Sequence, residues 1–134
     1  MKIYILLTVL VLGFLVSGCF NGDTEQGLLQ GTVSIGPLTP VEIPGQELNI
    51  NCEAYEARKI TIYDDRGDRL IAQVDIECNS DENRAFYQVW LEPGVYVVDI
   101  NHIGVDSSDD VPKTIEIISG ATVKLDIDID TGIR

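Results

Sequence analysis

The sequence predicts an all-β domain, a β-sandwich of seven short strands. Apolar and polar residues alternate with a period of two in seven segments, a pattern typical of strands that bury one face. Turn-forming residues separate these segments at short intervals, and no apolar stripe with helical spacing competes with the alternation. Short strands at this spacing are typical of two sheets packed face to face.

The predicted strands are defined by the apolar residues that alternate within each segment. In chain order these are Leu29, Gly31, Val33 and Ile35; Ile60 and Ile62; Leu70, Ala72, Val74 and Ile76; Tyr87, Val89 and Leu91; Tyr96, Val98 and Ile100; Ile115 and Ile117; and Val123, Leu125, Ile127 and Ile129. Turns are predicted at Asp65–Asp68, Glu92–Gly94 and Ser119–Gly120, and longer loops at Gly36–Glu56 and His102–Pro112. Pro93-Gly94 predicts a hairpin, because proline presets φ and glycine accepts a positive φ.

The N-terminus predicts a secretory signal peptide. Lys2 precedes an uncharged run from Ile3 to Val16, which is shorter than the roughly 20 apolar residues that a transmembrane helix needs. The residues Leu15-Val16-Ser17-Gly18-Cys19 resemble the lipobox of bacterial lipoproteins, in which the cysteine is lipidated and becomes the mature N-terminus. An ordinary secretory signal with an incidental cysteine, or an uncleaved anchor, is the alternative.

The lipobox resemblance implies a division of the chain into three parts. Residues 1–18 form the lipoprotein signal peptide, residues 19–27 the lipidated N-terminus with a flexible tether, and residues 28–134 the β-sandwich domain. The polar segment Asn21–Gln30 is predicted to be flexible. Two or more acyl chains on Cys19 would attach the protein lastingly to a membrane, in an extracytoplasmic position in the cell envelope or on the cell surface.

The mature chain is strongly acidic. Cleavage leaves 116 residues, enough for one domain, and the loss of Lys2 leaves 22 acidic against eight basic residues, a net charge of −14. Nucleic acid is not an expected partner, because phosphate binding depends on clustered lysine and arginine. A solvated acidic surface explains the charge without a partner.

Two cysteines remain after Cys19 is lipidated. Cys52 and Cys78 flank the predicted strands Ala57–Asp64 and Arg69–Glu77, so a hairpin between those strands would bring the cysteines together. Exported proteins fold where disulfides form, and we therefore predict a Cys52–Cys78 bridge. Free buried thiols or a two-cysteine metal site are the alternatives.

One segment resembles a known domain family. Leu91-Glu92-Pro93-Gly94-Val95-Tyr96-Val97-Val98 is similar to the L-x-P-G-x-Y-x-V hairpin of carboxypeptidase regulatory-like, or prealbumin-like, domains, and the strand and turn at Arg58–Gly67 also look like that family. The resemblance implies a seven-stranded Greek-key, Ig-like sandwich that serves as a non-catalytic accessory or adhesion module. The chain also resembles small uncharacterised lipoproteins of prokaryotes in the segments Ile35–Leu38 and Asp126–Arg134, which brings no activity.

Catalysis is not predicted. The single histidine, His102, lies in a predicted loop, where a surface or packing role is more common than a role as general base. No nucleophile elbow, zinc-binding helix motif or phosphate-binding loop is present in the sequence. Prealbumin-like hydrolases use several histidines and a Tyr-Arg-Gly-Ser tail, and this chain ends in Thr131-Gly132-Ile133-Arg134.

Carboxylates form the best candidate for a cofactor site, which would take calcium. One set of aspartates lies in a predicted loop and the other alternates along the last predicted strand: Asp106, Asp109 and Asp110, and Asp126, Asp128 and Asp130. Calcium takes six to eight oxygen ligands from such groups, but neither set matches the twelve-residue calcium loop. Otherwise no cofactor is expected, because the carboxylates are equally explained as the solvent side of a strand that resists edge pairing.

Aromatic residues supply a candidate binding face. Phe86 and Trp90 alternate out of phase with the buried residues of their strand, so they share its other face with Gln88. Such side chains stack on sugar rings or anchor protein contacts, although the loop Gly36–Glu56 is long enough to cover them, and we expect that it does. The sequence therefore predicts a non-enzymatic, membrane-anchored module with an unidentified protein or glycan partner.

Overall fold

The computed structural model describes residues 24–38 and 50–133. The predicted signal peptide, Cys19 and the central part of the loop Gly36–Glu56 lie outside the described residues. Within the described ranges, no helix is long and apolar enough to cross a membrane.

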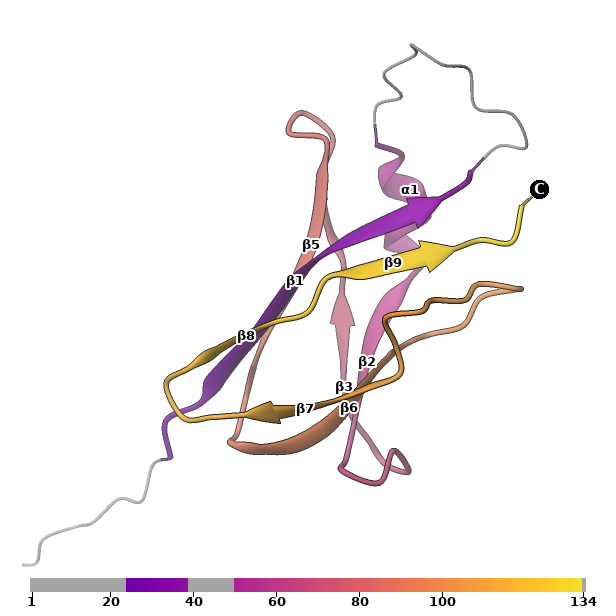
Figure 1. The fold of residues 1–134 in the computed structure, drawn as a ribbon. Coiled ribbons are helices and arrows are strands. Elements are labelled where there is room, and N and C mark those ends of the chain that lie inside the picture. Colours follow the sequence, from indigo (N-terminus) through magenta and orange to yellow (C-terminus); the bar gives the residue numbers. More distant parts are fainter. Residues whose placement is uncertain (1–23, 39–49, 134) are drawn as a thin grey trace, which may run out of the picture.

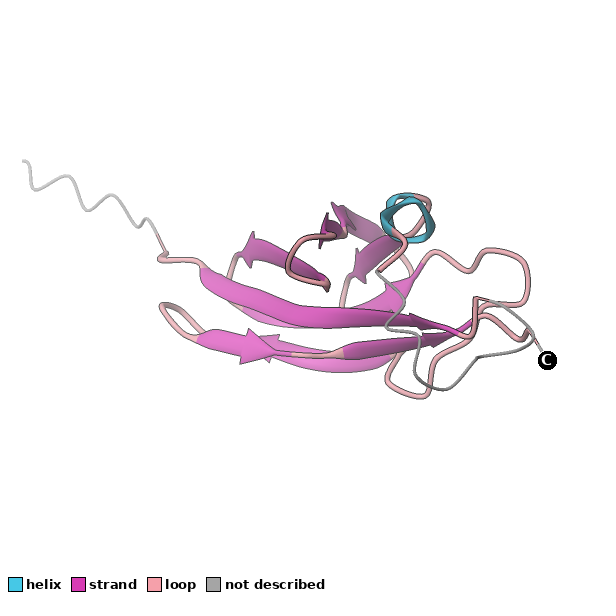
Figure 2. Ribbon diagram, turned by 90° about the horizontal axis from the view of Figure 1, so that it is seen from above, coloured by secondary structure: helices cyan, strands magenta, loops and turns pink. Residues whose placement is uncertain are grey.

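The described residues form two packed β-sheets, which confirms a mainly β, sandwich-like fold (Figures 1 and 2). The five-stranded sheet has the order β4 (Glu77–Asn79), β5 (Arg84–Leu91), β1 (Gly27–Gly36) and β8 (Thr122–Lys124), and β9 (Ile127–Asp130) also pairs with β1. The four-stranded sheet has the order β3 (Leu70–Asp75), β2 (Lys59–Tyr63), β6 (Gly94–Ile100) and β7 (Lys113–Ile117). A short helix, α1 (Cys52–Glu56), lies within the predicted loop Gly36–Glu56.

The core is built from the side chains that alternation predicted to be buried. Leu29 and Tyr87 from the five-stranded sheet, and Ile60 and Ile62 from the four-stranded sheet, are fully buried. Burial of side chains of this size contributes about 1.5–3 kcal/mol each, which makes this alternating pattern the main source of stability. Polar residues between them face solvent on most strands.

The third predicted strand divides between the two sheets. Its first part, β3, pairs with β2, whereas β4 pairs with β5. The buried residue Ile76 separates the two parts. The prediction of a single strand from Arg69 to Glu77 was wrong because alternation reports burial but not the partner strand.

The last predicted strand is also interrupted. Both parts pair in parallel with β1 in the same register, since Leu28 faces Thr122 and Val33 faces Ile127. Together, the two divided segments change the predicted seven strands into nine described ones.

The interruption between β8 and β9 surrounds Gly31. The Tyr87 hydroxyl donates to the Leu125 carbonyl oxygen at 2.6 Å. A Cβ atom added at Gly31 would lie 1.8 Å from that same oxygen. Glycine is required here because the backbone of a neighbouring strand occupies the space of a side chain.

The Pro93-Gly94 turn joins the two sheets. We predicted a hairpin, but β5 and β6 lie in different sheets, so the hairpin prediction was wrong. The Tyr96 hydroxyl donates to the Glu92 carbonyl oxygen at 2.7 Å and ties the start of β6 to the turn. This contact resembles the tyrosine corner of β-sandwiches, in which a tyrosine hydroxyl returns to the backbone a few residues upstream.

The predicted hairpin between β2 and β3 is confirmed. Gly67 has φ of +74° in its turn, and an Asp64 carboxylate oxygen accepts the backbone N–H of Asp68 at 2.9 Å. That backbone hydrogen bond lowers the pKa of the Asp64 carboxyl below its ordinary value.

The Cys52–Cys78 disulfide is confirmed, with 5.5 Å between the two Cα atoms. It joins the start of α1 to β4. The Asn51 side chain caps α1 by accepting the backbone N–H of Glu53 at 3.1 Å. One end of the sandwich is therefore fixed by a covalent bond and by the helix.

The predicted flexible segment is shorter than expected at its C-terminal side. β1 begins at Gly27, so Gly27–Gln30 belong to the central part of the sheet rather than to a tether. β1 begins at the end of the molecule opposite α1 and the C-terminus (Figure 1).

Candidate binding face

The candidate site lies on the outer face of the five-stranded sheet, which we call the open face. Its outward side chains form rows across β5, β1 and β8, because the strands are aligned in register. Gln88 pairs with Gln30, which pairs with Lys124, so two amides and an ammonium group lie in one row. Adjacent strands lie about 4.8 Å apart, which makes this row about 10 Å wide.

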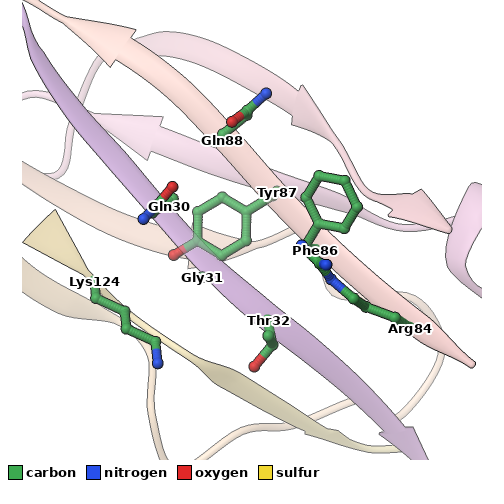
Figure 3. A pocket seen from close by; sticks show the side chains of 8 residues that line it. All are labelled: Gln30, Gly31, Thr32, Arg84, Phe86, Tyr87, Gln88 and Lys124. Atoms are coloured by element: carbon green, nitrogen blue, oxygen red, sulfur yellow. The ribbon is translucent and has the colours of Figure 1, made fainter. Parts of the chain in front are cut away.

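A hollow of about 210 Å³ occupies the centre of this face. Its lining includes Gln30, Phe86 and Gln88, together with the neighbouring residues labelled in Figure 3. Phe86 pairs with Thr32 in the row beside the two glutamines. The hollow thus offers an aromatic ring beside two amide groups and a hydroxyl, which can donate and accept hydrogen bonds.

Two cations line the hollow, and none of its lining residues is acidic. The Arg84 guanidinium lies over the Phe86 ring, 4.5 Å from its centroid, in a cation–π contact. Arg84 also lies 3.8 Å from a Glu82 oxygen, and Lys124 lies 3.6 Å from an Asp126 oxygen. Both ion pairs are exposed, so they hold the cations weakly and leave them able to contact a ligand.

The structure separates the two aromatic residues that the sequence placed together. Phe86 and Trp90 share the open face, but only Phe86 lines the hollow. Trp90 is four positions further along β5 than Phe86, a distance of about 13 Å. Trp90 is 60% exposed, so the expected covering is not provided by the described residues, and residues 39–49 of the proposed covering loop lie outside them.

Asp106 is part of a buried ion pair. Its carboxylate accepts two hydrogen bonds from Arg58, from Nε at 2.7 Å and from Nη2 at 3.1 Å. The Asp106 side chain is 4% exposed and that of Arg58 13%. Arg58 also donates to the Ala54 carbonyl oxygen at 2.7 Å, so the pair connects α1 to the loop before β7. The structure does not group Asp106 with Asp109 and Asp110, because its oxygens are engaged by the guanidinium.

The other five candidate aspartates lie close to the edge formed by β9. Local donors engage several of them: Asp126 accepts the Thr32 N–H at 2.9 Å, Asp128 accepts the Ser34 hydroxyl at 2.8 Å, and Asp110 accepts the Asp128 N–H at 2.8 Å. Asp109 lines a second hollow, of about 350 Å³, together with Asp110, Asp128 and Asp130. In residues 24–38 and 50–133, no three acidic, histidine or cysteine side chains form a group that could hold a metal ion.

His102 contacts acidic residues on both sides of its ring. Nδ1 lies 3.2 Å from the Asp106 carbonyl oxygen, and Nε2 lies 3.2 Å from a carboxylate oxygen of Asp99. The hydrogen bond to the Asp106 carbonyl is the main cause that raises the pKa of His102, and Asp99 adds to it. Both ring nitrogens therefore hold the loop between β6 and β7 in place.

The sequence analysis named Gln88 on the face of Phe86 and Trp90 but missed Gln30 and Arg58. The pairing of Gln88 with Gln30 depends on a register that the sequence does not give. Arg58 gave no sequence signal for its partner, which lies 48 residues away.

No protein-family model matches the chain, and no curated protein matches it.

Proposed function

We propose that this protein is a lipid-anchored, non-enzymatic module of the cell envelope that binds a glycan or protein partner through the hollow of the open face. The observation that carries the proposal is the combination of Phe86, Gln88 and Gln30 in one exposed hollow. Aromatic rings stack on sugar rings and anchor protein contacts, while amides orient polar partners. At about 210 Å³ the hollow is smaller than the roughly 300–1,000 Å³ of enclosed small-molecule sites, which favours a ligand that lies across the face.

The anchor rests on the lipobox at Leu15–Cys19. The acidic composition agrees with a soluble domain held near a membrane rather than with nucleic-acid binding. In this proposal the protein is extracytoplasmic, and residues 1–18 are removed on maturation.

The proposal includes a Greek-key sandwich of the carboxypeptidase regulatory-like type. The tyrosine contact between Tyr96 and Glu92 supports it, because it gives a structural reason for the Pro-Gly-x-Tyr segment. Domains of that type commonly act as accessory or adhesion modules, in agreement with a binding role.

A glycan array probed with the full mature protein tests the binding face. Phe86→Ala and Gln88→Ala are expected to reduce the signal of each bound glycan about tenfold, the loss expected for an aromatic contact or a hydrogen bond of about 1.4 kcal/mol. Gln73→Ala is the matched control, because Gln73 is exposed on β3 of the other sheet. If Phe86→Ala and Gln88→Ala bind every glycan as strongly as the native protein does, the hollow is not the binding site.

A calcium-dependent module is the second candidate. The observation in its favour is that Asp109, Asp110, Asp128 and Asp130 line one hollow; because no three of them form a group that could hold a metal ion in the described residues, calcium would have to draw them together. A ligand that binds only the native state raises the melting temperature. An unchanged melting temperature in millimolar calcium chloride would remove this candidate.

A further inference from the structure

Three exposed apolar side chains lie near the start of β1. Trp90 is 60% exposed, Ile118 57% and Val95 44%, which places them among the most exposed large hydrophobic residues of the described chain. They come from three separate segments: the end of β5, the start of β6 and the residue that follows β7. Trp90 projects from the outer face of the five-stranded sheet, whereas Val95 projects from the outer face of the four-stranded sheet, so these side chains lie on both faces of one end of the sandwich rather than in one patch. Apolar side chains exposed around one end of a domain are a candidate contact with another protein or a membrane.

Strand pairing brings these residues to the point where the chain enters the domain. Trp90 pairs with Leu28, the second residue of β1. A Cβ atom on Gly27 would lie 2.5 Å from the Ile118 carbonyl oxygen, so the start of β1 is in direct contact with that residue. Val95 is two residues past the Pro93 turn, opposite Glu116 of β7. We call Trp90, Val95 and Ile118 the entry cluster.

The position of Cys19 determines what lies beside the entry cluster. Gly27 is eight positions after Cys19, and a chain of that length reaches at most about 28 Å. If Cys19 carries acyl chains in the bilayer, this end of the domain stays within that distance of the lipid surface, while α1 and the C-terminus lie at the opposite end (Figure 1).

We propose that the entry cluster is a membrane-contact surface that rests on the lipid interface and orients the anchored domain. The inference rests on the anchoring part of the proposed function. Tryptophan favours this interface, because its ring combines an apolar body with a polar N–H group. The lipid anchor makes the contact intramolecular, so a small apolar cluster is sufficient for docking.

The charges near the entry cluster determine which lipid headgroups it can contact. Glu116 pairs with Val95, Glu92 follows β5, and Glu25 lies next to Gly120 in the turn after Ile118. Carboxylates are repelled by anionic headgroups within a Debye length of about 8 Å at physiological ionic strength. The cluster therefore fits a zwitterionic lipid surface, and anionic lipid weakens the contact.

Docking at this end leaves the Phe86 side of the hollow accessible. Gln88, which lines the hollow, is two residues from Trp90, about 7 Å along β5, and Phe86 is about 13 Å away. The two aromatic residues of the open face thus have different roles, one toward lipid and one toward the partner.

Fluorescence of the lipidated protein in phosphatidylcholine vesicles tests this surface. Trp90 is the single tryptophan of the chain, so emission reports on the entry cluster directly. We expect quenching by acyl chains brominated near the headgroup, and less quenching when anionic phosphatidylserine is added. Ile118→Ser is expected to shift the docking equilibrium about fivefold toward the undocked state, which corresponds to about 1 kcal/mol of lost apolar transfer.

Val105→Ser is the matched control, because Val105 is 74% exposed but belongs to the loop between β6 and β7. It should leave quenching unchanged. Lipidated protein whose Trp90 emission is the same in brominated and unbrominated vesicles would overturn the inference while the anchor stands. A protein that carries no lipid on Cys19 and is not quenched would overturn both the inference and the anchor.

Discussion

Removal of the Asp106 carboxylate is expected to destabilise the domain strongly in the absence of any metal. The Arg58 side chain is only 13% exposed. After Asp106→Ala, its guanidinium keeps the hydrogen bond to the Ala54 carbonyl oxygen but loses both hydrogen bonds to the carboxylate. Loss of one partner of a buried ion pair costs about 3–5 kcal/mol, because a buried charge remains uncompensated. We take the lower limit of about 3 kcal/mol, since Arg58 keeps that acceptor and some solvent contact.

Thermal unfolding followed by circular dichroism in EDTA measures this loss. For a domain of this size, about 3 kcal/mol lowers the melting temperature by about 10–15 °C. Asp109→Ala is the control, because Asp109 is exposed and its loss should change stability by no more than about 0.5 kcal/mol. The double variant Arg58→Met with Asp106→Leu should recover most of the loss, because replacement of both charges by apolar groups removes the unpaired charge.

A calcium ligand would behave differently from a structural ion pair. If Asp106 served calcium, Asp106→Ala would leave the melting temperature in EDTA unchanged and would abolish a rise caused by calcium. A loss below about 1 kcal/mol in EDTA would refute the ion-pair reasoning, because it would mean that Arg58 is well solvated without its partner.

Three further predictions concern the fold. Gly31→Ala should prevent folding or lower the free energy of unfolding, measured by chemical denaturation, by more than about 3 kcal/mol, because the added Cβ meets the Leu125 carbonyl oxygen at 1.8 Å. Gly36→Ala is the control and should fold normally, since nothing lies within 4 Å of its added Cβ. The raised pKa of His102 predicts stability that is full below about pH 6.5 and declines as pH rises through the folded-state pKa; His102→Gln should lack this decline in urea titrations, and an identical pH profile would contradict it. Loss of the Cys52–Cys78 bridge, which spans 26 residues, should cost about 3.5 kcal/mol in the chain-entropy model, measured on the Cys52→Ala, Cys78→Ala protein; equal stability of that double variant would contradict it.

The sequence predicted the sandwich and most buried residues because burial imposes a period of two. Leu29, Ile60 and Tyr87 were all assigned to the buried face of their strands, and the structure confirms them. The same pattern failed at Ile76, where the chain passes from one sheet to the other while its side chains remain buried. Alternation identifies a buried face, but partner strands are set by contacts distant in sequence.

The disulfide was predictable, and the site was predictable only in part. The spacing of Cys52 and Cys78 around the β2–β3 hairpin brings the two cysteines near each other, although the bridge joins α1 to β4 of the other sheet. Phe86 was predicted as an outward aromatic beside Gln88, but the lining residues from β1 and β8, such as Gln30 and Lys124, lie more than 30 residues away in the sequence. Asp106 pairs with Arg58, and a loop aspartate in the sequence gives no indication that an arginine 48 residues earlier will be its partner.

The proposed role depends most directly on the chemistry of Cys19. Mass spectrometry of the N-terminal peptide from protein exported by a bacterial host measures it. We predict a peptide that begins at Cys19 and carries a thioether-linked diacylglycerol, with residues 1–18 removed. An unmodified peptide that still contains the Gly18–Cys19 bond would contradict lipid anchoring.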